Sequence, residues 1–133
     1  MKRDIILFLE DILENIERIE NSTKTLSKED FDKSLDIQDA TIRRIEVMGE
    51  SVKNIPESFR QKYPEIEWRK IAGSRDVIIH HHFGINLETI WIVVKDELPE
   101  LKEKVSKVLT EEIKEILKKE EKQKKIRTKE DKI

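Results

Sequence analysis

Apolar residues recur along the chain at alternating steps of three and four, which places their side chains on one face of an α-helix. The first such stripe predicts an amphipathic helix over about Lys2 to Ser22, and the polar residues around Thr23 end it. The stripe consists of Ile5, Leu9, Ile12, Ile16 and Ile19, with Leu13 widening it.

A second stripe predicts a helix that begins after Ser27 and runs to about Asn54. The Ser27 hydroxyl can cap this helix, and Asp30 stands at the capping-box position. Glycine inside a helix costs roughly 1 kcal/mol relative to alanine, so Gly49 suggests close packing against a neighbouring helix. The side chains expected to face inward are Phe31, Leu35, Ile42, Ile45, Met48 and Val52.

Three further helices are predicted after Asn54. Proline suits the first turn of a helix, so a short one is expected over Pro56–Lys62. A fourth helix spans about Glu67–His82, with Gly84 as its stop. The fifth follows an Asn86 cap, and Pro99 should kink or divide it because its nitrogen cannot donate to the preceding turn. The apolar stripe of this helix is Leu87, Ile90, Trp91, Val94, Leu98, Leu101, Val105, Val108, Ile113 and Ile116.

After Leu117 the helical pattern is lost. Residues 118–133 are almost all charged or polar, with only Ile126 and Ile133 apolar. This tail is predicted to be either a frayed, solvated helix or disordered. The pattern as a whole predicts an all-α domain at residues 1–117, an up-and-down bundle of four to five helices, followed by the charged tail.

Composition narrows the classes of function. The 133 residues suit one domain, and the absence of cysteine excludes a disulfide framework and a thiolate metal site. No apolar run approaches the roughly 18 residues that a membrane span needs, so we expect a cytoplasmic protein with no membrane contact. The net charge of −2 means that RNA binding would require a local basic patch. The candidates, each of which could instead be an ordinary solvated charge, are Arg43, Arg44, Arg60, Lys62, Arg69, Lys70 and Arg75.

Candidate chemistry is concentrated in the segment Arg75–Gly84, which holds all three histidines beside an arginine. Arginine suits phosphate and histidine exchanges protons near neutral pH, so together they suggest work on a phosphodiester. Asp76, four residues before His80, can hydrogen-bond that imidazole and fix its tautomer; the alternative is an exposed contact worth only tenths of a kcal/mol. Three consecutive histidines diverge by about 100° each on a helix, so no metal ion or other cofactor is predicted.

The arginine and the first histidine do not lie together on a straight helix. Arg75 and His80 are five residues apart, which separates them by about 140° around the axis, whereas His82 lies closer to Arg75 in azimuth. A joint site therefore needs a long reaching arginine, an unwound helix end or a second subunit. Taken alone, this pattern favours surface residues over catalytic ones. The two tryptophans add little evidence for a binding site. Trp68 could stack a base, but a packing role is more typical of a tryptophan at this position, and Trp91 lies on the apolar stripe of the fifth helix.

The same segment resembles the HepT-like ribonuclease toxins of the HEPN superfamily. Their mark is Arg, four to six residues, then His, usually followed two positions later by Tyr; here these are Arg75, His80 and, in the tyrosine's place, His82. The resemblance extends from about Asp4 to Leu109 and leaves the tail outside. It also includes, in the family's order, the blocks Asp39–Glu50, Ile55–Pro56, Trp68–Gly73 and Leu98–Leu101.

The resemblance implies the toxin of a type II-like toxin–antitoxin pair, a metal-independent endoribonuclease with Arg75 and His80 as catalytic residues and Asp76 and His82 in support. It implies a HEPN-like fold and a symmetric homodimer in which both motifs line one cleft. The implied partners are RNA, either tRNA or mRNA, and an MNT-type nucleotidyltransferase antitoxin. Residues proposed to contact RNA are Arg43, Arg69 and Lys70.

The departure at His82 leaves an alternative open. In the resembled family, the antitoxin attaches adenylate to the motif tyrosine, whereas His82 has no hydroxyl for a stable adenylyl ester. Tyr63, the sole tyrosine, lies well before the motif. We therefore expect no silencing by tyrosine adenylylation within the motif, and the chain could instead be a non-catalytic helical dimer module that binds nucleotide, RNA or a nucleotidyltransferase partner. Glu50, an acid in one of the shared blocks, has no role that the sequence assigns.

Overall fold

A computed structural model describes residues 2–73 and 86–131, and all the regular elements within these ranges are helical. The predicted all-α class is thus confirmed. None of the described helices is long and apolar enough to cross a bilayer. In chain order the elements are α1 (Lys2–Thr23), α2 (Lys28–Lys33), α3 (Leu35–Lys53), α4 (Glu57–Lys62), a helix at residues 68–73, α6 (Leu87–Ile92), a π-helical turn (Val93–Glu97) and α7 (Leu98–Asp131).

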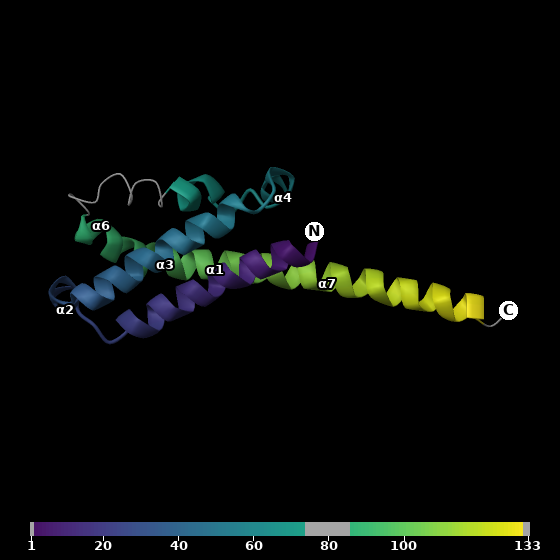
Figure 1. The fold of residues 1–133 in the computed structure, drawn as a ribbon, viewed down its shortest axis with the longest axis horizontal. Helices are drawn as coiled ribbons and strands as arrows, with labels where there is room; N and C mark the ends of the chain where they lie inside the picture. Colours follow the sequence, from purple (N-terminus) through teal and green to yellow (C-terminus); the bar gives the residue numbers. More distant parts are fainter. Residues whose placement is uncertain (1, 74–85, 132–133) are drawn as a thin grey trace.

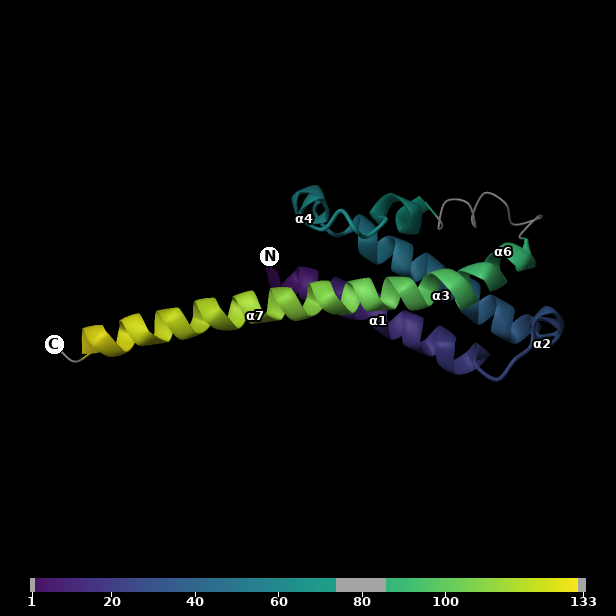
Figure 2. The same cartoon turned by 180° about the vertical axis from the view of Figure 1, so that it is seen from behind.

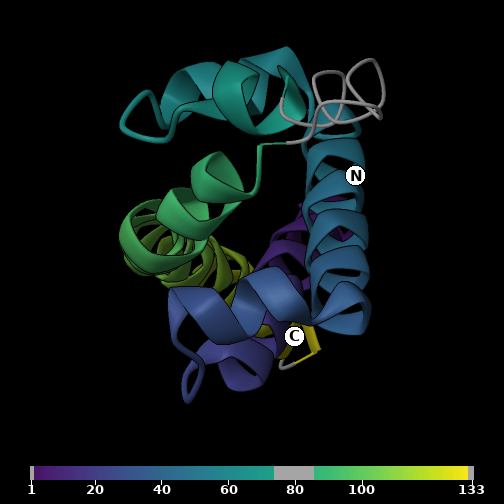
Figure 3. The same ribbon diagram turned by 90° about the vertical axis from the view of Figure 1, so that its left-hand side faces the viewer.

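The long helices α1, α3 and α7 form the centre of the molecule, and α1 packs against both of the others. α1 runs antiparallel to α3 and α7 (Figure 1). The up-and-down course through the predicted fourth helix, at residues 67–82, stays a prediction, because most of that helix lies outside the described residues. α4 and residues 68–73 lie on the side of α3 that faces away from α1 (Figures 1 and 3). The start of the helix predicted to carry the motif is therefore an outer layer over α3.

The core follows the predicted stripes closely. The stripe of α1 is fully buried from Leu9 to Ile19, and it meets apolar residues from α2, α3 and α7. Burying each such side chain stabilises the fold by roughly 1.5–3 kcal/mol. The largest side chains with essentially no exposed surface are Phe31, Leu9, Ile12, Ile16, Ile19, Met48, Ile55, Val52, Val105 and Val108.

The prediction of one helix from Ser27 to Asn54 is wrong, because Ser34 interrupts it and separates α2 from α3. Ser34 is extended (φ −105°, ψ 96°), and its hydroxyl accepts a hydrogen bond from Ile37 N (3.3 Å), which caps α3. The buried Gln38 amide donates to the Phe31 carbonyl (2.8 Å), one of the groups that the break frees. The break also turns Leu35, predicted to face inward, into a 71% exposed residue.

The predicted helix starts are confirmed. Ser27 and Asp30 form the reciprocal capping box, with both hydrogen bonds at 3.1 Å. Pro56 precedes α4, and Asn86 Oδ1 accepts from the backbone N of Glu88 (3.0 Å) and of Thr89 (3.4 Å) at the start of α6. The side chains of Ser27, Asp30 and Asn86 thus satisfy backbone donors that a helix start leaves unpaired.

The predicted interruption near Pro99 takes the form of a π-helical turn. Proline has no N–H and its ring crowds the carbonyl four residues earlier, so the preceding turn cannot keep regular α-helical hydrogen bonding. The turn at Val93–Glu97 accommodates this by widening, and Leu98 N bonds Val93 O five residues back. The helical rod stays continuous through the interruption (Figure 2).

The tail continues α7 as a helix up to Asp131, and every side chain from Leu117 to Glu130 is exposed. Figure 2 shows this end of α7 extending beyond the bundle. One ion pair near its base joins Glu120 to Arg3 of α1 (3.7 Å). Residues 118–131 are thus helical in this structure, and the division into a domain at residues 1–117 and a charged tail stays a prediction.

Candidate functional site

The predicted catalytic and supporting residues, Arg75, Asp76, His80 and His82, all lie in the segment 74–85, outside the described residues. The mutual geometry expected of them therefore stays a prediction. The structure describes their frame on both sides: the helix at residues 68–73, which leads into the segment, and α6, which follows it.

Trp68 fixes the start of the leading helix. It is 6% exposed, and its indole Nε1 donates to the Tyr63 carbonyl at 2.9 Å. The expectation that Trp68 packs is confirmed, since a buried and hydrogen-bonded indole has no face left for a base. Tyr63 itself packs against the Phe59 ring, with centroids 5.2 Å apart. The helix at residues 68–73 thus begins from a buried aromatic anchor.

A buried carboxylate ties this anchor to α7. Glu112 is 3% exposed and accepts hydrogen bonds from Tyr63 Oη (2.5 Å) and Lys62 Nζ (2.8 Å). Lys62 also bonds the half-exposed Glu115 (3.2 Å). The Tyr63 hydroxyl therefore donates its hydrogen bond to Glu112, and Tyr63 as a whole is only 5% exposed. Burial, together with the hydrogen bond to Glu112, raises the pKa of Tyr63, and the same carboxylate raises the pKa of Lys62.

Sequence reasoning missed Glu112. The apolar stripe of α7 was predicted to continue through Ile113, which is 38% exposed, whereas Glu112 takes the buried position four residues after Val108. An acid in a helix rich in Lys and Glu is typical of a solvated face. Its spacing of seven residues from Val105 and four from Val108 was the available signal, and the partners Lys62 and Tyr63, some fifty residues earlier, could not be read from it.

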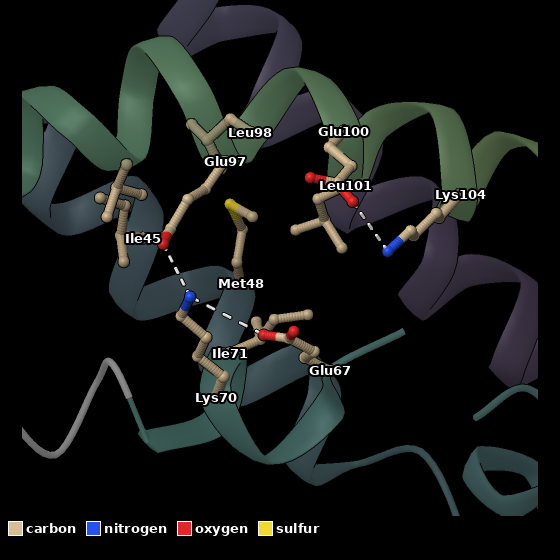
Figure 4. Close-up of a pocket in the computed structure, with 11 residues that line it drawn as sticks. Ile45, Met48, Glu67, Lys70, Ile71, Glu97, Leu98, Glu100, Leu101 and Lys104 are labelled. Carbon is tan, nitrogen blue, oxygen red and sulfur yellow. Dashed lines mark hydrogen bonds and ion pairs between the residues drawn. The ribbon is translucent and has the colours of Figure 1, made fainter. Parts of the chain in front are cut away.

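A cavity of about 200 Å³ lies between α3, residues 67–71, the π-helical turn and the start of α7. Figure 4 shows Met48 and Leu101 pointing into it and charged residues around its mouth. Lys70 bonds Glu97 at 2.7 Å and lies 3.7 Å from Glu67, and Glu100 pairs with Lys104 at 3.1 Å. Because its charges are paired with one another, this cavity has an apolar interior and a nearly neutral rim. It is better suited to an apolar group than to phosphate.

The predicted basic patch is largely engaged within the chain. Arg43 pairs with Glu46 (3.4 Å), Arg44 donates to the Arg18 carbonyl (3.3 Å), and Lys62 and Lys70 hold the acids described above. Arg69 is exposed and lines a second, open hollow of about 540 Å³ together with Arg60 and Lys70. Exposed ion pairs contribute less than about 1 kcal/mol, so phosphate could displace them. The predicted RNA contacts at Arg43, Arg69 and Lys70 stay predictions.

Comparisons with known proteins agree on one family. Residues 12–108 match the family model described as Ribonuclease HepT-like. Over 108 residues, 81% of this chain, the sequence is 44% identical to a protein of Thermococcus cleftensis named "Probable ribonuclease HepT", of which it covers 98%. It is equally identical over 108 residues to a Methanocaldococcus jannaschii protein named "Putative RNase", of which it covers 89%.

A third relative is longer. The chain is 46% identical over 111 residues, 84% of its length, to a Methanocaldococcus jannaschii protein named "Gamma-glutamylcyclotransferase and putative RNase". It spans half the length of that relative. No solved structure matches the chain significantly.

Proposed function

The chain belongs to the ribonuclease HepT-like family, and from this premise we propose that it is a metal-independent endoribonuclease whose catalytic residues are Arg75 and His80. The observation that carries the proposal is the family match over residues 12–108, which contains the whole Arg-x4-His motif. Relatives named as ribonucleases, at 44% identity over most of their length, support it.

The proposed reaction is a transesterification at phosphorus. The ribose 2′-oxygen attacks the neighbouring phosphate, and the bond from phosphorus to the 5′-oxygen breaks. His80 takes the proton from the 2′-hydroxyl or gives one to the leaving 5′-oxygen, and solvent closes the proton balance. Arg75 stabilises the charge that builds on the phosphoryl oxygens in the transition state. The products are a 2′,3′-cyclic phosphate and a 5′-hydroxyl.

Asp76 and His82 have supporting roles in this proposal. Asp76, one helical turn before His80, orients its imidazole and keeps it basic. His82 is nearer to Arg75 in azimuth and can donate a hydrogen bond to phosphate, so it replaces part of what a tyrosine would do at this position.

We further propose that the active unit is a symmetric homodimer. One straight helix separates Arg75 from His80 by about 140°, and two copies of the motif facing each other across a two-fold axis remove that difficulty. In the cell, the dimer would act as the toxin of a toxin–antitoxin pair in the cytoplasm, held in check by an MNT-type nucleotidyltransferase. The substrate would be tRNA or mRNA.

A second function is favoured by one observation, the histidine at position 82 where the family's motif usually has tyrosine. It is a non-catalytic helical dimer that binds nucleotide, RNA or a nucleotidyltransferase partner. Expression in a host separates the two functions. Growth arrest by the intact chain that Arg75→Ala and His80→Ala each relieve, at equal protein levels, supports the ribonuclease. Unaffected growth with tight RNA or partner binding supports the module.

A further inference from the structure

We propose that the exposed end of α7 binds the phosphate backbone of RNA through one face of the helix. This face holds Lys118, Lys122, Lys125 and Lys129, which we call the lysine stripe. The inference deepens the proposed function, on which it rests for the identity of the polyanion as RNA. It concerns residues beyond the 12–108 family match, so the family gives these lysines no role.

The four lysines share a face because of their spacing. An α-helix turns by about 100° per residue, so steps of four, three and four keep all of them within an arc of about 60°. At 1.5 Å per residue, they extend over about 16 Å of helix length. All four side chains are exposed. Among residues 118–131, the acid nearest to this arc is Glu121, about 40° beyond Lys125; Glu115 lies three residues before Lys118 and about 20° beyond Lys122.

The opposite face of the same helix carries no net charge, so the two faces differ in charge. It holds Glu120, Lys124, Arg127 and Asp131, in which each acid stands four residues from a base, the spacing at which helical side chains pair. Glu120 also contacts Arg3 at 3.7 Å. No ion pair of the stripe lysines is found in the part of the chain that the structure describes, although Glu121 stands four residues before Lys125. The positive charge of the tail is thus concentrated on one side.

The charge of the whole chain is divided between the tail and the body. Residues 118–133 hold eight basic and four acidic side chains; because the chain as a whole carries −2, residues 1–117 carry −6. An acidic body repels RNA over a distance of about a Debye length, roughly 8–10 Å at moderate salt. The tail extends beyond the bundle (Figures 1 and 2), so the stripe is carried away from that body.

The chemistry of the tail favours a nucleic-acid backbone over other anionic partners. Residues 118–131 contain one apolar residue, Ile126, which is 51% exposed. They therefore offer neither the apolar face that a membrane-surface helix buries nor the seam of a coiled coil. A row of ammonium groups with no apolar or base-reading neighbours suits regularly spaced phosphates, which bind lysine by charge and counterion release without regard to sequence.

The test uses the full-length chain carrying His80→Ala, so that the RNA probe stays intact, and follows the fluorescence anisotropy of a labelled single-stranded RNA from 0.05 to 1 M salt. The stripe variant Lys122→Gln/Lys125→Gln is compared with the matched control Lys124→Gln/Arg127→Gln, which removes two charges from the neutral face. Glutamine has a helix propensity close to that of lysine, and circular dichroism verifies the helix.

Each lost phosphate contact on single-stranded RNA lowers the slope of log K against log salt by about 0.7. The stripe variant should thus lose about 1.4 in slope, equivalent to binding about 25-fold weaker at 0.1 M salt with a deficit that disappears near 1 M. The control should change the slope by less than half as much. Equal losses in both variants, or none in either, would overturn the proposal.

Two further measurements distinguish RNA binding by the stripe from a contact between copies of the chain, and separate this inference from the proposed ribonuclease function. A stripe variant that changes the mass by light scattering, with unchanged RNA binding, would make the stripe a contact between copies and overturn the proposal. Cleavage is measured in parallel on chains that keep His80. Stripe-dependent RNA binding without any cleavage contradicts the ribonuclease and leaves the inference standing. Cleavage with stripe-independent binding overturns the inference alone.

Discussion

Replacing Glu112 by alanine should destabilise the bundle by about 2 kcal/mol, an unusual cost for an acid in so charged a helix. Glu112 is 3% exposed and accepts a hydrogen bond from the Tyr63 hydroxyl. Tyr63 is also buried, at 5% exposed. Removing the carboxylate leaves this hydroxyl buried without a partner, and such a group costs about 1–3 kcal/mol. For a chain of 133 residues, 2 kcal/mol corresponds to a melting temperature lower by about 7 °C.

The matched control is Glu115→Ala. Glu115 is the other carboxylate on Lys62 (3.2 Å), but its side chain is 45% exposed, so its loss should change stability by less than about 0.5 kcal/mol. A double-mutant cycle with Tyr63→Phe isolates the buried contact: once the hydroxyl is gone, Glu112→Ala should cost about 1 kcal/mol less than in the wild type. Thermal and urea unfolding measure all five chains: the wild type, the three single variants and the double variant. Equal effects of Glu112→Ala and Glu115→Ala would refute this reasoning.

The same contact predicts a pH dependence. Burial and Glu112 raise the pKa of Tyr63 in the folded chain, while the unfolded chain keeps a value near 10. Above that pH the unfolded state releases its proton first, so stability present below about pH 10 is lost as the pH rises further. The raised pKa of Lys62 acts in the same direction. Tyr63→Phe should flatten the alkaline loss, and an unchanged profile would contradict the assignment.

The chain should be a homodimer at micromolar concentration by light scattering; a monomer with full activity contradicts the shared cleft. Truncation after Leu117 should shift the melting temperature by less than about 3 °C, since residues 118–130 are exposed, and a larger loss would show that the tail supports the fold. Incubation with ATP and the cognate nucleotidyltransferase, followed by peptide mass spectrometry, should leave residues 75–84 unmodified. The buried Tyr63, held by Glu112, should also stay unmodified, and adenylate on either would contradict the prediction.

Helix positions were predictable because the code for them is local. The stripe from Leu9 to Ile19 and the Asn86 cap each depend on residues within a few positions of one another, and both are confirmed. The break at Ser34 was missed because it depends on competition. Ser34 and Gln38 offer the backbone alternative hydrogen bonds, and only the packed structure decides between these and a continuous helix.

The residues of the candidate site were predicted from a family resemblance and not from local patterns. The motif residues could be named from their resemblance to a family, and the family is confirmed, whereas the structure leaves Arg75 and His80 outside its described ranges. The contacts that anchor the helix at residues 68–73 could not be predicted, because the link from Trp68 through Tyr63 to Glu112 joins residues about fifty positions apart. From sequence alone, an acid such as Glu112 is predicted to be solvated, because its partners Lys62 and Tyr63 are distant along the chain.

The most direct test of the central claim is cleavage of a labelled RNA by the purified chain in EDTA, next to His80→Ala and Arg75→Ala proteins of equal stability. A matched strand with a single 2′-deoxy substitution at the cleaved position serves as the control substrate. The account predicts cleavage by the intact chain with a 2′,3′-cyclic phosphate end, at least 100-fold slower cleavage by His80→Ala, and none at the 2′-deoxy position. Equal cleavage by the intact chain and His80→Ala, or none by either, would contradict it.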